Sequence, residues 1–132
     1  MGRKIKAIIT KVGLDSHERG AKLVATALKN AGMEVVYLGS FQTPEGIVNT
    51  AIQEDADIIG VSCLSGEHLT LVPIIIELMK KNGIGHIPLI AGGVIPKKNI
   101  PVLKAAGVKE VFGYGTTMED MVQYVKDICN NN

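Results

Sequence analysis

Ile5-Lys6-Ala7-Ile8-Ile9-Thr10 begins a unit that the rest of the chain repeats. This short run, rich in isoleucine, predicts a buried strand. Residues 20–31 carry apolar residues at helical spacing and end before Gly32, which predicts a helix. A strand, a loop and a helix in this order form the βα unit of parallel sheets. The repetition of this unit along the chain predicts an α/β fold.

The alternation recurs four more times. Strands are expected at Ile5–Thr10, Glu34–Leu38, Ile58–Ser62, Pro88–Ala91 and Glu110–Phe112. Helices are expected at Gly20–Ala31, Pro44–Glu54, Leu69–Asn82, Lys97–Ala106 and Thr117–Cys129, with Gly32, Gly83 and Gly107 as C-terminal stops. Five right-handed βα units predict one parallel sheet with helices on both faces. The commonest order for five strands is 2-1-3-4-5, the doubly wound flavodoxin-like (Rossmann-like) arrangement.

Length and composition favour one domain over residues 1–132. Apolar residues make up 46% and aromatic residues 4%, so aliphatic side chains must fill the interior, which suits a parallel sheet covered by helices. A net charge of +1 gives no support for nucleic acid or an anionic membrane as partner. Cys63 and Cys129 match neither zinc nor redox spacing. With no secretory core or spanning apolar run, we expect a cytoplasmic protein with reduced thiols.

The predicted topology has its ligand crevice at the carboxyl ends of the first and third strands. The loop after the first strand carries Asp15 and His17, the third strand ends at Ser62, and Gly92-Gly93 follows the fourth. Small residues at strand ends let a ligand approach the backbone or enter between sheet and helix. The sequence therefore predicts a slot at this edge of the sheet, and Cys63 is expected to lie in it as a small buried side chain.

His17 is a candidate metal ligand. A neutral imidazole binds a transition metal through one ring nitrogen, and Asp15 is close enough in sequence to take the other ring N–H. One histidine cannot hold a free zinc or iron ion, so the remaining ligands would come from a cofactor with its own ring of donors, as in haem or a corrin. A simpler alternative is that the Asp-x-His loop caps the following helix. The loop alone leaves both interpretations open.

Two other functions of this fold disagree with the residues. A response-regulator receiver needs an acidic pair after the first strand and an aspartate at the end of the third, where this chain has Ser62. A flavodoxin needs a phosphate loop rich in Ser, Thr and Gly, but Asp15 and Glu18 put two carboxylates there. A metal macrocycle with a long appended tail fits both the isolated histidine and the slot.

At these residues the chain resembles the cobalamin-binding domain of adenosylcobalamin-dependent mutases. The likeness rests on three signatures in the family's order and spacing: Asp15-x-His17-x-x-Gly20, Ser62-x-Leu64 and Gly92-Gly93. It covers nearly the whole chain. The segments Phe41–Glu45, His68–Pro73 and Gly92–Pro96 are similar to the acyl-CoA mutase branch, of the methylmalonyl-CoA mutase C-terminal domain type, rather than to glutamate mutase.

The resemblance implies that cobalamin binds with its dimethylbenzimidazole base displaced by His17, which Asp15 orients. The displaced tail would occupy the slot, with residues 112–116 as its far wall. The family usually has Tyr at the position of Phe112 and Pro at that of Tyr114, so the bottom of this pocket is expected to differ. The expected cofactor contacts, with His17 as the metal ligand, are Asp15, Ser16, His17, Glu18, Arg19, Gly20, Ser62, Leu64, Gly92, Gly93, Val94, Phe112, Gly115 and Thr116.

The family homolyses the Co–C bond of adenosylcobalamin and binds its substrate in a TIM barrel. The resemblance implies an isomerase subunit with no catalytic residue of its own, inactive without a large TIM-barrel subunit. Methylmalonyl-CoA is the expected substrate, and 2-hydroxyisobutyryl-CoA or a related branched acyl-CoA is the alternative. A corrinoid methyl carrier is a further alternative, but such carriers normally have a helical cap before the first strand, here expected at about residue 5. A cobalamin sensor would need an effector domain.

Overall fold

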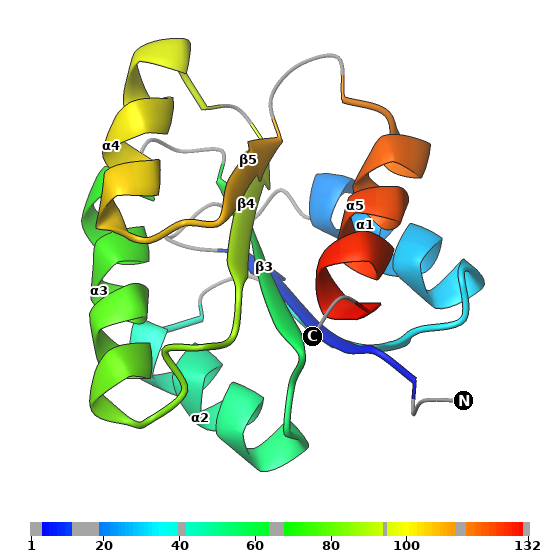
Figure 1. The fold of residues 1–132 in the computed structure, drawn as a ribbon, viewed down its shortest axis with the longest axis horizontal. Coiled ribbons are helices and arrows are strands. Elements are labelled where there is room, and N and C mark those ends of the chain that lie inside the picture. Colours follow the sequence, from blue (N-terminus) through cyan, green and yellow to red (C-terminus); the bar gives the residue numbers. More distant parts are fainter. Residues whose placement is uncertain are drawn as a thin grey trace.

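A five-stranded parallel sheet, in the order β2-β1-β3-β4-β5, forms the centre of the molecule (Figure 1). The computed structural model describes residues 4–11, 19–39, 42–63, 68–93, 95–112 and 116–130. The strands are β1 (Lys6–Lys11), β2 (Glu34–Leu38), β3 (Ile58–Cys63), β4 (Leu89–Gly93) and β5 (Glu110–Phe112). The order and the parallel pairing confirm the predicted flavodoxin-like arrangement.

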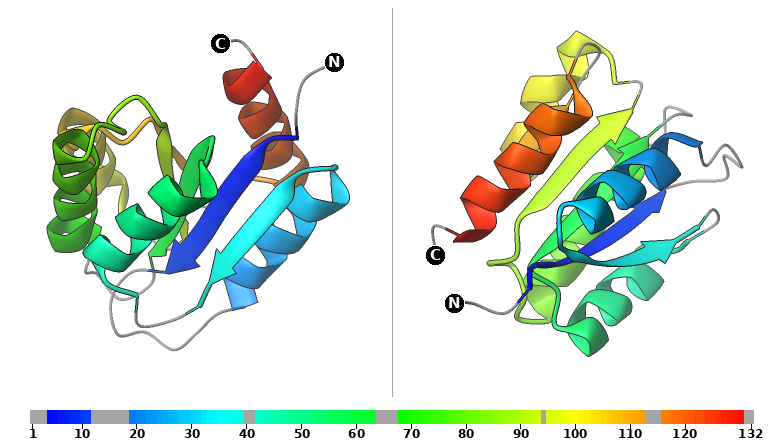
Figure 2. Two further views of the ribbon diagram at one scale, coloured as in Figure 1. Left: turned by 90° about the horizontal axis from the view of Figure 1, so that it is seen from below. Right: turned by 90° about the vertical axis from the view of Figure 1, so that its right-hand side faces the viewer.

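Helices cover both faces of the sheet. The helices α2 (Pro44–Glu54), α3 (His68–Lys81) and α4 (Ile100–Ala106) lie on one face, and α1 (Arg19–Asn30) and α5 (Met118–Asn130) lie on the other (Figure 1). The right-hand view of Figure 2 shows α1 and α5 in front of the strands. Because side chains alternate along a strand, each strand contributes to two cores. Ile59 packs in the α2/α3/α4 core and Ile58 in the α1/α5 core.

The predicted boundaries of β2, β5 and α2 agree with the structure, and most others differ by one or two residues. The helix expected over 97–106 instead begins as a 3₁₀ turn, η1 (Lys97–Asn99), before α4. Pro101 explains this start, because a proline without an N–H fits only the first turn of an α-helix. Thr43 caps α2: its Oγ1 accepts the Gly46 N–H at 3.0 Å. The three glycine stops all have positive φ.

The main correction concerns the carboxyl edge of the sheet. Ser62-Cys63 and Gly92-Gly93 were expected at or beyond the strand ends, but they are the last residues of β3 and β4. The two strands remain in register to their ends, with Ser62 opposite Gly92 and Cys63 opposite Gly93. The ladder continues because Gly93 has no Cβ to collide with the backbone of Cys63, so the end of β4 can lie close to β3. The slot therefore has a sheet as its floor rather than loops.

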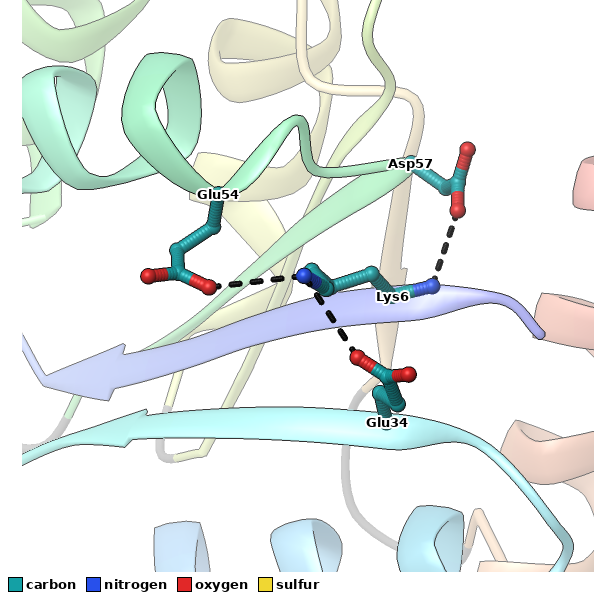
Figure 3. A network of polar contacts seen from close by, with 4 residues as sticks. All are labelled: Lys6, Glu34, Glu54 and Asp57. Carbon is teal, nitrogen blue, oxygen red and sulfur yellow. Dashed lines mark hydrogen bonds and ion pairs between the residues drawn. The ribbon is translucent and has the colours of Figure 1, made fainter. Parts of the chain in front are cut away.

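The opposite edge of the sheet is held by Lys6 (Figure 3). Its Nζ lies 3.4 Å from carboxylate oxygens of both Glu34 and Glu54, and its backbone N–H donates to Asp57 Oδ2 at 2.8 Å. Partial desolvation lowers the pKa of Lys6, but its hydrogen bonds to the two glutamates outweigh this effect and raise the pKa overall. These contacts connect β1 to β2 and to the segment leading into β3, far from the predicted slot.

Candidate cofactor site

A pocket of about 590 Å³ lies between the carboxyl half of the sheet and helices α1 and α5. Strands β1, β3, β4 and β5 form its floor, and the two helices form its sides. Its volume is within the range of small-molecule and cofactor sites. The described residues that line it are Ile9, Ala21, Leu23, Val24, Gly60, Val61, Ser62, Ile90, Ala91, Gly92, Gly93, Phe112, Thr116, Met118 and Met121.

Small residues in one row of the sheet create the hollow. Ser62, Gly92 and Phe112 are consecutive partners across β3, β4 and β5. Registered residues of neighbouring parallel strands present their side chains to the same face, so this row faces α1 and α5, where Phe112 packs. A hydroxymethyl group and a missing side chain leave space between strand and helix. This is the slot that the sequence predicted.

The two adjacent glycines of β4 have different roles. A Cβ on Gly92 would lie 3.5 Å from the Phe112 carbonyl oxygen, an ordinary contact, so the backbone there could carry a side chain. A Cβ on Gly93 would lie 2.4 Å from the Cys63 carbonyl oxygen, and Gly93 has φ +108°. Gly93 is therefore required by the fold, whereas Gly92 keeps the pocket open.

Phe112 forms a wall of the pocket and is itself held by Tyr124 of α5. The two rings meet edge to face, with centroids 5.3 Å apart and an interplanar angle of 79°. Burial, followed by the charge of Glu110, raises the pKa of Tyr124, so its ring stays neutral at physiological pH. Phe112 therefore lines the pocket as one ring of a packed aromatic pair, and its contact with a cofactor stays a prediction.

The pocket is apolar inside and at its mouth. Among the described lining residues, the polar side chains are the hydroxyls of Ser62 and Thr116. Leu23 and Met118 line the pocket and remain 51% and 38% exposed. A pocket with an apolar interior, two hydroxyls and an open glycine position suits a flat aromatic group on a polar tail. It therefore fits the tail of a cobalamin.

The structure brings part of the expected set of cofactor contacts together in one place. The expected contacts from three strands and from the segment just before α5 that line this one pocket are Ser62, Gly92, Gly93, Phe112 and Thr116. Arg19 and Gly20 are the first residues of α1. The remaining expected contacts lie outside the described residues and stay predictions: Asp15, Ser16, His17, Glu18, Leu64, Val94 and Gly115.

Cys63 was expected in the slot, and this was wrong. Its side chain is buried in the core on the α2/α3/α4 face, because the residue after Ser62 points to the opposite side of the strand. Burial raises the pKa of its thiol to about 12. Cys63 is a core residue and not a cofactor contact.

Sequence reasoning also missed residues that matter at this edge. Gly60, Ile9 and Ile90 form the pocket floor, but they were read only as strand residues. Lys11 was placed after the first strand, yet it ends β1 in register with Ser62 and is fully buried. A buried ammonium group needs polar partners, so a lysine at the end of an apolar run indicates a polar environment at that strand end.

The described residues contain no group of three His, Cys, Asp or Glu side chains arranged to hold a metal ion. None of the helices in the described ranges is long and apolar enough to cross a membrane.

The fold and the pocket together define a class of ligand-binding α/β domain, and comparison with known families identifies it. The model of the B12 binding domain matches residues 5–122. The chain belongs to the B12-binding domain family.

Named relatives fall in the acyl-CoA mutases. The chain is 45% identical to the 2-hydroxyisobutanoyl-CoA mutase small subunit of Aquincola tertiaricarbonis, over 94% of this chain and 91% of that one. It is 43% identical to the pivalyl-CoA mutase small subunit of Xanthobacter autotrophicus, over 93% and 82%. It is 41% identical to methylmalonyl-CoA mutase of Cereibacter sphaeroides, over 96% of this chain but 18% of that protein. These matches confirm the resemblance to mutase cobalamin domains.

A solved structure supports the fold. A cobalamin-binding protein from Desulfitobacterium hafniense superimposes with a TM-score of 0.82 at 23% identity, covering 95% of this chain and 59% of that one. At this identity the likeness concerns the fold.

Proposed function

We propose that this chain is the cobalamin-binding small subunit of an adenosylcobalamin-dependent acyl-CoA mutase. The observation that carries the proposal is the convergence of Ser62, Gly92, Gly93, Phe112 and Thr116 on one apolar pocket beside the carboxyl edge of the sheet. These residues belong to two of the three family signatures and to the expected far wall. When bound, the cofactor supplies the radical chemistry through its Co–C bond.

The chain's own residues bind and orient. The pocket takes the tail of the cofactor, with Ser62 and Thr116 offering hydroxyls to its polar atoms. His17, in the segment between β1 and α1, is the proposed cobalt ligand. Asp15 is the proposed partner of its second ring nitrogen, which would fix the tautomer and make the histidine a stronger donor.

The substrate favoured here is a branched acyl-CoA of the 2-hydroxyisobutanoyl or pivalyl type. Two relatives are named after mutases of these compounds. Both are small subunits, and both match this chain over most of their own length. Methylmalonyl-CoA mutase, our first expectation from the sequence, matches as an 18% portion of a longer protein. Substrate selection belongs to the proposed large TIM-barrel subunit.

Exposed apolar side chains support a partner at the carboxyl edge. Six large apolar side chains of the described residues are exposed. Ile52 and Ile74 lie farther along α2 and α3, but four lie within the first five residues of their helices and are 38% to 53% exposed: Leu23, Leu69, Val102 and Met118. Helices that follow a strand begin at the carboxyl edge of a parallel sheet, so these four side chains surround the end that holds the pocket. An apolar rim of this kind is typical of a surface covered by a ligand or by another protein.

Cofactor ligation can be tested on the isolated chain. The purified chain is loaded with cob(II)alamin and examined by electron paramagnetic resonance with either natural or ¹⁵N-labelled histidine. We expect a superhyperfine pattern that changes with the label and is absent in His17→Ala. The matched control is His86→Ala, which removes an exposed histidine. A label-dependent pattern that survives in His17→Ala would refute the ligand assignment.

The enzymatic role requires the partner. The large-subunit candidate is the product of a neighbouring reading frame for a TIM-barrel mutase. The assay mixes this protein with the chain, adenosylcobalamin and each acyl-CoA in turn. We expect isomerisation that depends on both proteins, with 2-hydroxyisobutanoyl-CoA or pivalyl-CoA preferred over methylmalonyl-CoA. Methyl transfer to or from the bound corrinoid, without isomerisation, would instead identify a methyl carrier.

A further inference from the structure

The row of lining residues farthest from the carboxyl edge has a glycine at its centre. Gly60 lies in β3 between its register partners Ile9 of β1 and Ile90 of β4, and all three line the pocket. A Cβ on Gly60 would lie 2.9 Å from Ile9 Cδ1 and 3.6 Å from Ile90 Cγ1. The ends of both isoleucines therefore occupy the space above Gly60 that a side chain would need.

We propose that Gly60 sets the depth of this pocket, and thereby the size of the aromatic base that the cofactor tail can carry into it. The inference rests on the proposed function, because it takes the tail to be the occupant. It adds a specificity-determining residue that belongs to none of the three signatures.

The direction of the effect follows from the packing around Ile9. This side chain is 3% exposed and belongs to the α1/α5 core, with the sheet beneath it. A methyl group on Gly60 would push Cδ1 away from the sheet, and the open space on that side is the pocket. Gly60→Ala would therefore make the pocket shallower in two ways, through its own methyl group and through the displaced end of Ile9.

A glycine here is unfavourable unless it has a purpose. Glycine within a strand loses more conformational entropy on folding than alanine and packs nothing. The neighbouring positions of β3, Ile59 and Val61, carry large buried side chains. Close approach of another group to the strand is one of the reasons for such a glycine. Here the approaching group is Ile9, whose Cδ1 would lie 2.9 Å from a Cβ on Gly60. The glycine lets this side chain lie low on the sheet, which leaves the space above it for the cofactor base.

The test compares three corrinoids on the full 132-residue chain. They are cobalamin, with a 5,6-dimethylbenzimidazole base, the analogue with unsubstituted benzimidazole, and cobinamide, which has no base. Dissociation constants are measured by absorption titration for the parent, Gly60→Ala, Ile9→Val and the double variant. The matched control is Gly85→Ala, whose Cβ would have atoms of Lys80 as its nearest neighbours, the closest at 3.3 Å, and neither residue lines the pocket.

We expect the parent to bind cobalamin more tightly than cobinamide. Gly60→Ala should weaken cobalamin binding by roughly five- to a hundredfold, the range that corresponds to the usual cost of overpacking. It should weaken the benzimidazole analogue less and cobinamide not at all. Ile9→Val removes the Cδ1 atom that would be crowded, so the double variant should recover most of the lost affinity for cobalamin.

The outcomes separate the two proposals. A parent that binds cobinamide as tightly as cobalamin would overturn the tail pocket itself. A parent that discriminates, with Gly60→Ala unchanged or equally weakened for cobinamide, would overturn only the role of Gly60. If Gly60→Ala does not fold, Ile9→Val alone tests the inference. Because this variant has a deeper floor, it should bind a cobamide with a bulkier naphthimidazole base more tightly, relative to cobalamin, than the parent does. An unchanged ratio of these two affinities would overturn the inference.

Discussion

Alanine substitutions at the two adjacent glycines of β4 should have different effects, one on stability and the other on cofactor binding. Gly93→Ala places a Cβ 2.4 Å from the Cys63 carbonyl oxygen at a residue with φ +108°. Gly92→Ala places a Cβ at ordinary contact distance, 3.5 Å from the Phe112 carbonyl oxygen, on the face that lines the pocket. We expect the first variant to lose stability and the second to lose cofactor affinity.

The size of the Gly93 effect follows from two costs. A non-glycine residue in this region of φ costs about 1–3 kcal/mol. Lengthening the contact with Cys63 to an ordinary distance moves the end of β4 by about 1 Å and weakens the final ladder bonds, at about 1 kcal/mol each. The expected loss is about 2–4 kcal/mol, a fall in Tm of roughly 10 °C for a domain of this size.

Urea denaturation and cobalamin titration of both variants test this division. Gly92→Ala should be as stable as the parent, or more stable by about 0.4–1 kcal/mol because alanine restricts the unfolded chain. Its affinity for cobalamin should fall about tenfold, since the new methyl group occupies the pocket. The reasoning fails if Gly93→Ala unfolds within about 0.5 kcal/mol of the parent, or if Gly92→Ala loses as much stability as its neighbour.

Three further predictions concern the fold. Burial raises the Cys63 pKa from 9.0 to about 12. The stability that the neutral thiol contributes is therefore complete below pH 9 and is lost as the pH rises towards 12. In urea denaturation at increasing pH, the free energy of unfolding of Cys63→Ala should fall less steeply than that of the parent. Lys6→Gln should destabilise the chain slightly at low salt and not at high salt, because its two ion pairs are partly exposed; equal losses at both salt concentrations would contradict this. Thr43→Ala should cost about 1 kcal/mol in urea denaturation by removing the cap on the Gly46 N–H, while Thr43→Ser should retain most of it.

The alternation of apolar runs and helical segments was enough to predict strand order and most boundaries. Strand patterns such as Ile58–Ser62 are bounded by turn residues, and local chemistry such as the Thr43 cap acts within a few residues. The last residue of a strand is determined less by the local sequence. The last pairs of β3 and β4 depend on two strands fitting each other, so the sequence placed Gly92 and Gly93 beyond the strand that includes them.

Pocket residues could be predicted from the sequence where the residue type alone indicates a role. Ser62 and the glycine pair were identified because small residues at strand ends leave space. Gly60 escaped notice, because a glycine inside an apolar run shows its purpose only once Ile9 and Ile90 are seen across it. Cys63 was misplaced for a related reason: one residue along a strand changes the face, and the sequence alone did not establish which face the slot occupies.

The two faces of β3 explain how the chain can be stable and still hold a large hollow. Towards α2, α3 and α4 the strand presents Ile59, Val61 and Cys63, all buried. Towards α1 and α5 it presents Ile58, then Gly60, then Ser62, so the apolar packing diminishes towards the carboxyl edge. One face therefore supplies a complete core, and the other leaves its last layer to be filled by a ligand. A ligand that binds only the folded chain stabilises it in proportion to its affinity and concentration, so folding of the α1/α5 side and binding of the proposed cofactor are thermodynamically linked.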